Sequence, residues 1–122
     1  PRVSRAAWLD AAKMSYRVQP TPQAEADIER LFNSLVESRG EDVAREWYES
    51  YTEAVHRLVT MPLSCGLAYE NASFDEEIRH LLFRLSQKRK FRGLFTVRGD
   101  EVVILAVRAP GEKPVNPDDI EG

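Results

Sequence analysis

The stretch EIRHLLFRLSQKRKFRGLFTVRGDEVVILAVR, residues 77–108, decides the fold because its pattern predicts three consecutive antiparallel strands. In the first strand Leu81, Phe83 and Leu85 alternate with a mixed set of residues, which predicts one buried face. The unbroken run VVILAV, 102–107, is typical of a central strand covered on both faces. Between them, RGDE at 98–101 predicts a tight hairpin turn.

The same stretch has the highest positive charge of the chain. Residues 78–98 contain seven basic and no acidic side chains, whereas residues 24–57 contain nine acidic and four basic ones, and the net charge of the chain is −3. A basic sheet end facing away from an acidic helical layer predicts a site for an anionic partner, either a phosphate backbone or an acidic peptide. A solvated hairpin rim explains the same charge equally well.

Length and composition predict one soluble domain. The chain has 122 residues, of which 43% are apolar and 30% charged, as in ordinary globular proteins. No apolar run approaches the roughly 20 residues that a membrane-spanning helix needs, and no signal peptide pattern is visible. The lone Cys65 offers neither a disulfide nor a ligand cluster. We therefore expect a cytoplasmic protein with no cofactor, no metal and no membrane partner.

Signals along the chain divide it into three parts. Residues 1–13 are a leader of uncertain origin with a short helical pattern, and Met14 is interpreted as a natural start. Residues 14–110 form the compact domain. Residues 111–122, with two prolines and four acidic side chains, predict an exposed tail.

Within the domain the sequence predicts a strand at 16–19 and then two helices. Thr21 and Pro22 are a helix N-cap and first-turn proline, and Gly40 ends that helix after about residue 39. A second amphipathic pattern covers about 42–60, and the short connection predicts an antiparallel helical hairpin. Residues 63–75 are expected to form an irregular loop.

Two motifs in this order resemble the RelE/ParE superfamily of bacterial type II toxins. YRVQPTPQAEADIERLF, 16–32, resembles the family's opening strand followed by T-P-x-A-x-x-D-[IL]. FRGLFTVRGDEVVILAVR, 91–108, resembles its closing strand pair. The resemblance covers nearly everything after Met14 and implies an α+β fold, in which the helical hairpin packs on a twisted, mainly antiparallel sheet.

The resemblance also implies a growth-inhibiting toxin, of a kind often linked to plasmid stabilisation, that a cognate antitoxin neutralises. RelE-like members cut messenger RNA on the ribosome, whereas ParE-like members inhibit DNA gyrase without hydrolysis. An oligomer, either with the antitoxin or between copies of the chain, is expected. The long uninterrupted helical hairpin is more similar to ParE.

RNA cleavage needs proton carriers as well as cations for the phosphorane charge. The family's frequent Arg-His pair at the end of the last strand is Arg108-Ala109 here, and neither His nor Tyr follows. His80 is the substitute proton carrier. If the protein is a metal-independent ribonuclease, its catalytic residues are His80 and four cations: Arg84, Lys88, Lys90 and Arg92.

The preferred interpretation is therefore a toxin that binds gyrase rather than an enzyme. Its expected target-binding residues are the cations of the sheet: Arg79, Arg84, Lys88, Arg89, Lys90, Arg92 and Arg108. The alternatives are a ribonuclease acting on ribosome-bound messenger RNA and an inactive, toxin-derived binding protein.

Overall fold

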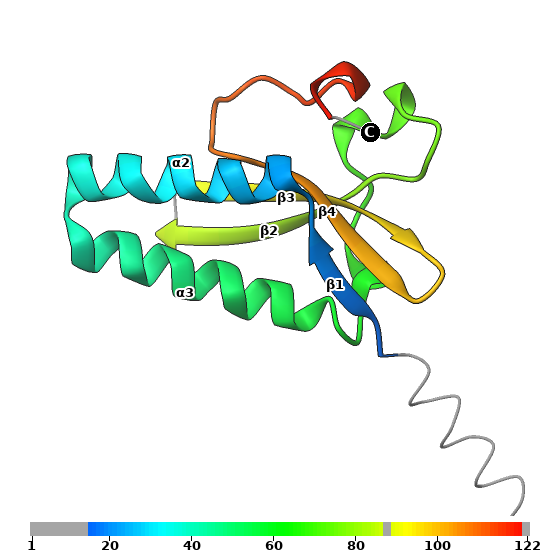
Figure 1. Ribbon diagram of the computed structural model, residues 1–122, viewed down its shortest axis with the longest axis horizontal. Helices are drawn as coiled ribbons and strands as arrows, with labels where there is room; N and C mark the ends of the chain where they lie inside the picture. The colour runs from blue at the N-terminus through cyan, green and yellow to red at the C-terminus, as the bar shows by residue number, and fades with distance from the viewer. Residues whose placement is uncertain (1–14, 87–88, 121–122) are drawn as a thin grey trace, which may run out of the picture.

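The structure, a computed structural model, describes residues 15–86 and 89–120, and it consists of two helices packed on a four-stranded sheet (Figure 1). The predicted leader, 1–13, lies outside the described residues. The elements are β1 (Arg17–Pro20), α2 (Pro22–Arg39), α3 (Glu41–Arg57), β2 (Arg79–Ser86), β3 (Arg89–Arg98) and β4 (Glu101–Arg108). Short 3-10 helices lie at Pro62–Ser64, Tyr69–Ser73 and Pro117–Asp119. This single-domain α+β architecture confirms the predicted fold class.

Helix α2 begins and ends where its capping residues predict. The Thr21 hydroxyl accepts a hydrogen bond from the Ala24 N–H at 3.1 Å, and Pro22 occupies the first turn of α2. Gly40 ends α2 with φ of 96°, a conformation that disfavours any residue with a side chain. Helix α3 starts one residue later, so the two helices run antiparallel. It ends at Arg57, and residues 58–60, predicted as helix, form turns.

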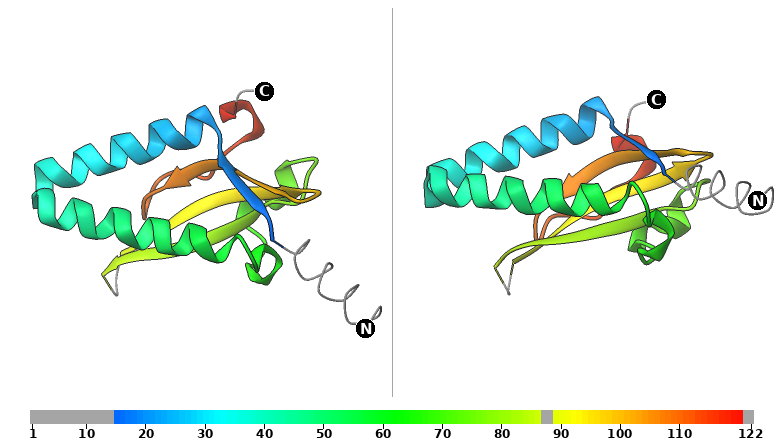
Figure 2. Two further views of the ribbon diagram at one scale, coloured as in Figure 1. Left: turned by 60° about the horizontal axis from the view of Figure 1, so that its bottom comes forward. Right: turned by 90° about the horizontal axis from the view of Figure 1, so that it is seen from below.

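The sheet order is β1-β4-β3-β2, which places β4 inside the sheet (Figure 2, right). Strand β1 pairs with β4 in parallel, with Val18 opposite Val102, and the other two pairings are antiparallel. Every residue from Val102 to Val107 is buried, which confirms the prediction of a central strand covered on both faces.

Each face of the sheet has its own apolar core. On the helix side, the fully buried Trp47 of α3 packs on Phe91 with ring centroids 5.4 Å apart, and Phe83 joins the same cluster. The opposite face, called here the outer face, has a smaller core that contains Ile78 and Leu94. The second core is covered by loop residues before β2 and by the chain after β4.

Residues 109–120, called here the C-terminal strap, provide part of that cover. Most of the strap is exposed, but Val115 is only 1% exposed and belongs to the outer-face core. Its N–H donates a hydrogen bond to the carboxylate of Glu70 at 2.9 Å. The tail is therefore mostly exposed, as predicted, but Val115 is buried. This residue departs from the prediction because it packs on the apolar core of the outer face.

Candidate target-binding face

Strand alternation gathers basic side chains on the outer face. Phe91 belongs to the helix-side core, so its neighbours Lys90 and Arg92 point to the opposite side of β3. Arg84 of β2 is opposite Lys90, and Arg108 of β4 is opposite Arg92. Residues directly opposite one another share a face of the sheet. Four cations from three strands therefore lie on the outer face.

One of these cations, Arg92, is neutralised by a carboxylate that the sequence pattern does not reveal. Arg92 donates two hydrogen bonds to Glu70, at 3.0 and 2.9 Å, and the two side chains are 13% and 1% exposed. Burial by itself raises the pKa of Glu70, but the hydrogen bonds from Arg92 and from the Val115 N–H outweigh it and lower that pKa below its ordinary value. The Arg92 guanidinium also lies over the Tyr69 ring, 4.9 Å from its centroid.

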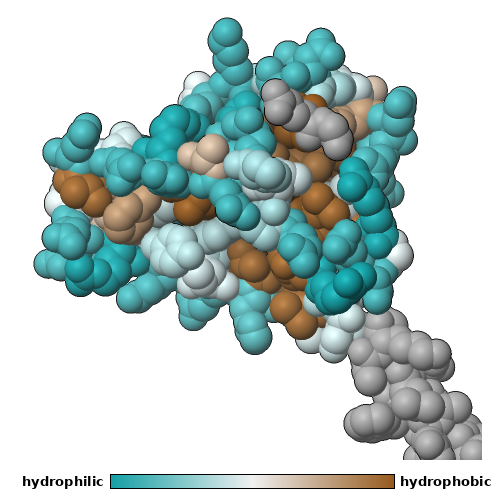
Figure 3. Space-filling model, in the orientation of Figure 1, coloured by the Kyte–Doolittle hydropathy of each residue, from teal (hydrophilic) through white to brown (hydrophobic). Residues whose placement is uncertain are grey.

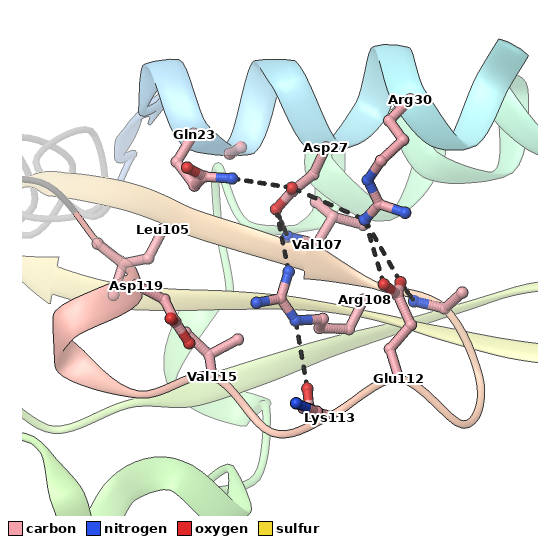
Figure 4. A network of polar contacts seen from close by, with 12 residues as sticks. Gln23, Asp27, Arg30, Leu105, Val107, Arg108, Glu112, Lys113, Val115 and Asp119 are labelled. Carbon is pink, nitrogen blue, oxygen red and sulfur yellow. Dashed lines mark hydrogen bonds and ion pairs between the residues drawn. The ribbon is translucent and has the colours of Figure 1, made fainter.

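A second cation, Arg108, joins β4 to α2 and to the strap (Figure 4). Its Nη1 lies 3.6 Å from Oδ2 of the buried Asp27, and its Nε donates to the Lys113 carbonyl at 3.3 Å. Asp27 also accepts a hydrogen bond from the Val107 N–H at 2.9 Å. Arg108 is thus held by a network of contacts within the fold.

A third predicted site residue, Arg79, is on the helix side of β2 and is also engaged. It forms an ion pair with Glu77 at 2.9 Å and donates hydrogen bonds to the carbonyls of Leu63 and Cys65. Its side chain is 20% exposed. These contacts attach the loop before β2 to the sheet.

Near the β2–β3 turn, Arg84 and Lys90 lie together on the outer face and are called here the hairpin cluster, whereas Arg89 lies on the helix side of β3. Among the described residues no carboxylate lies within ion-pairing distance of these three side chains. The Arg89 guanidinium lies 5.5 Å from the centroid of the Phe91 ring. Lys88, at the turn itself, lies outside the described residues. The hairpin cluster can therefore attract an anionic surface without first breaking an ion pair.

His80 lines a cavity of about 310 Å³ on the outer face, together with Tyr69, Lys90 and Arg92. The His80 and Tyr69 rings meet edge to face with centroids 6.2 Å apart. Burial lowers the pKa of His80, the charge of Arg92 lowers it further, and Glu70 opposes both effects. The lowered pKa favours the neutral form of His80, and within the described chain its Nδ1 has no hydrogen-bond partner.

An apolar groove runs between the two helices, on the side away from the sheet. Its cavity of about 650 Å³ is lined by Ile28 and Phe32 of α2 and by Tyr48 and Tyr51 of α3. Figure 3 shows apolar side chains between the helices, flanked by hydrophilic ones. The charged Glu25, Glu29 and Arg45 also line this cavity.

Neither a metal cluster nor a membrane span is found in the part of the chain that the structure describes. No group of three or more His, Cys, Asp or Glu side chains in residues 15–86 and 89–120 is arranged to hold a metal ion. No helix in those ranges is long and apolar enough to cross a bilayer.

Comparison with known proteins identifies the fold. No protein-family model and no curated protein matches the sequence. A chain of the chromosomal ParDE TA system from P. aeruginosa superposes with a TM-score of 0.63 and 22% identity, covering 79% of this chain and 97% of that one. The chain has the RelE/ParE fold.

The resemblance drawn from the two sequence motifs is therefore confirmed at the level of the fold. A chain of the archaeal RelE-RelB complex from Pyrococcus horikoshii OT3 is similar more loosely, with a TM-score of 0.40, 14% identity and coverage of 81% and 99% of the two chains. The assignment to the RelE/ParE fold rests on the first structure.

Two residues of this RelE/ParE fold were not singled out from the sequence. Tyr69 and Glu70 lie in the loop that was expected to be irregular, and in the structure they form a short 3-10 helix at the outer face. Their contacts with Arg92 join positions 22 and 23 residues apart. No local spacing pattern signals such a contact. A lone buried carboxylate in a loop is recognisable only from its tertiary partners.

Proposed function

We propose that this protein is the toxin of a type II toxin-antitoxin pair and that it inhibits growth by binding DNA gyrase. The likeness to a chain of a ParDE TA system supports the toxin assignment. The free charges of the hairpin cluster support binding as the mode of action, because an unpaired basic surface attracts an anionic partner at little desolvation cost.

One observation favours binding over catalysis. Arg92 and Arg108, two of the outer-face cations, are each held by a buried carboxylate, Glu70 and Asp27. A ribonuclease site needs cations that are free to stabilise the phosphorane charge. Arg92, which lines the cavity beside His80, would have to leave Glu70 to do so, and residues 109–122 contain neither His nor Tyr as a proton carrier.

The test is a double variant in which Arg84 and Lys90 are replaced by Ala. We expect it to lose growth inhibition in cells and inhibition of gyrase supercoiling with purified components. Its free energy of unfolding should change by less than about 1 kcal/mol, because exposed charges contribute little to stability.

The matched control removes Arg17 and Arg98, two exposed arginines at the end of the sheet opposite the β2–β3 turn. It changes the net charge equally and should keep its activity. Full activity of the hairpin variant, or an equal loss in the control, would show that the hairpin cluster is not the target-binding site.

The same proposal includes an antitoxin that covers apolar surface of the toxin. The groove lined by Ile28, Phe32, Tyr48 and Tyr51 fits the apolar side of a partner helix, which is a common mode of peptide recognition. With the groove uncovered, the isolated toxin is expected to self-associate. Sedimentation of the purified protein over a range of concentrations measures this, and a strictly monomeric toxin would contradict it.

A second candidate function, messenger RNA cleavage on the ribosome, is favoured by one cavity. His80, Tyr69 and Lys90 line it together, so a histidine, an aromatic ring and an unpaired cation share one site. If this site cleaves RNA, His80→Gln should lower the cleavage rate on programmed ribosomes by about 10²–10⁴-fold. If the protein binds gyrase, the same variant should keep its growth inhibition, and neither form should cleave RNA.

A further inference from the structure

The outer edge of β2 is only half used by the chain itself. Strand order places β2 at the edge of the sheet opposite β1 (Figure 2). Residues 66–68 pair with its first part, since Ala68 donates to the Ile78 carbonyl at 2.9 Å and His80 donates to the Gly66 carbonyl at 3.1 Å. The backbone groups of positions 78 and 80 therefore point away from β3.

The second half of this edge is open. In an antiparallel pair, alternate residues direct their N–H and C=O groups to the same side, so Leu82 and Arg84 point outward as His80 does. Within the described residues no backbone group pairs with the outward N–H and C=O of Leu82 and Arg84. A row of such unpaired groups is a template for another strand.

Exposed apolar side chains lie beside the start of the open half. A cavity of about 360 Å³ lies between the end of the 64–66 loop and β2, and its lining includes Met61 and Leu82. These two side chains are 58% and 43% exposed, and Leu67, on the segment that pairs with the first half, is 52% exposed. An added strand would therefore bury apolar surface as well as satisfy backbone groups.

The charges along this edge indicate the chemistry of its partner. Arg84 lies on the open half, Lys90 is opposite it on β3, and Arg57 is at the rim of the cavity. No carboxylate in the described part of the chain lies within ion-pairing distance of these three side chains. A second copy of this chain would bring its own Arg84 to the same edge, and like charges directly opposite one another destabilise a strand pair. The edge favours an acidic partner instead.

We propose that the open half of β2 is a docking edge for an extended, acidic and apolar segment of a partner protein, which adds to the sheet as a fifth strand. Backbone hydrogen bonds to Leu82 and Arg84 supply the register, and the cavity beside Met61 receives an apolar side chain. The identification of this partner as the antitoxin rests on the proposed function, whereas the docking edge itself does not.

The probe is a synthetic peptide of alternating valine and glutamate. Its control is the same peptide with every glutamate replaced by lysine. Binding to the full chain is measured by fluorescence anisotropy, and amide hydrogen exchange locates it. We expect the acidic peptide to bind and to slow exchange at the amides of Leu82 and Arg84. The lysine peptide should bind at least about tenfold more weakly, equivalent to about 1.4 kcal/mol.

Leu82→Pro removes the outward N–H without removing a hydrogen bond between β2 and β3, since proline is tolerated where an edge N–H faces solvent. It should weaken binding of the acidic peptide by about tenfold or more, whereas Leu82→Thr, which keeps the N–H, should weaken it less. Arg84→Glu should shift the preference toward the lysine peptide, and it tests the edge even if the proline variant fails to fold.

Unchanged binding in both Leu82→Pro and Arg84→Glu would overturn the proposal. Protection of the Leu82 and Arg84 amides that rises with protein concentration alone would also overturn it, because a second copy would then occupy the edge. If the peptide binds at this edge but the protein does not inhibit growth, the docking edge is supported and the proposed toxin function is refuted.

Discussion

The buried ion pair between Glu70 and Arg92 should stabilise this fold far more than its exposed ion pairs do. Replacing Glu70 by Gln keeps the side-chain shape but leaves the Arg92 guanidinium, 13% exposed, without its counter-charge. Breaking a buried pair by removing one partner costs about 3–5 kcal/mol. The residual exposure of Arg92 and its contact with Tyr69 favour the lower end, about 3 kcal/mol.

Urea denaturation followed by circular dichroism measures this loss. With a denaturant dependence of about 1–3 kcal/mol per molar urea, the midpoint should fall by about 1–3 M. The matched control is Glu76→Gln, which removes the ion-pair partner of Arg98. The contacts of this pair are equally short, at 2.7 Å, but its side chains are exposed, 53% for Arg98 and 42% for Glu76. Its cost should stay below about 1 kcal/mol. Equal losses in the two variants would refute burial as the source of the stabilisation.

The same carboxylate predicts a pH dependence. The pKa of Glu70 is lower in the folded state than its ordinary value, so its contribution is present above the unfolded pKa and is lost as the pH falls through the folded one. The wild type should therefore lose stability in the acid range more steeply than Glu70→Gln. Parallel stability curves for the two proteins below about pH 4 would contradict the assignment.

Two further outcomes are expected. The NMR titration of His80 should have a midpoint below about 6.5, and a midpoint above that value would contradict the buried geometry. The free energy of unfolding should decrease as the pH falls below about 6.5, because the unfolded chain binds the proton of His80 more readily than the folded one. Trp47→Ala should lower the free energy of unfolding, measured by urea denaturation, by about 3–5 kcal/mol because the side chain is fully buried. Trp47→Phe should lower it less, because the Nε1 that it removes has no hydrogen-bond partner in the described chain. Equal losses in the two variants would contradict this packing.

The sequence by itself determined the elements and their faces. The Thr21-Pro22 start and the Gly40 end of α2 were predictable because caps act on backbone groups within a few residues. The buried face of β2 and the interior position of β4 were predictable because side-chain direction alternates along any strand. The gathering of Arg84 and Lys90 on one face follows from the same alternation, given the hairpin between β2 and β3.

Only the tertiary structure decided which of the basic residues are free. The sequence shows a segment of seven cations with no acidic residue, yet Glu70, Glu76 and Glu77 from the preceding loop pair with Arg92, Arg98 and Arg79. Likewise, Asp27 pairs with Arg108 across 81 positions, and Val115 is buried against the outer face. Such pairings depend on how distant segments pack, and no periodicity in the sequence encodes them. The local sequence pattern therefore locates the charge, whereas the packing of the loop and the strap determines which charges a partner can bind.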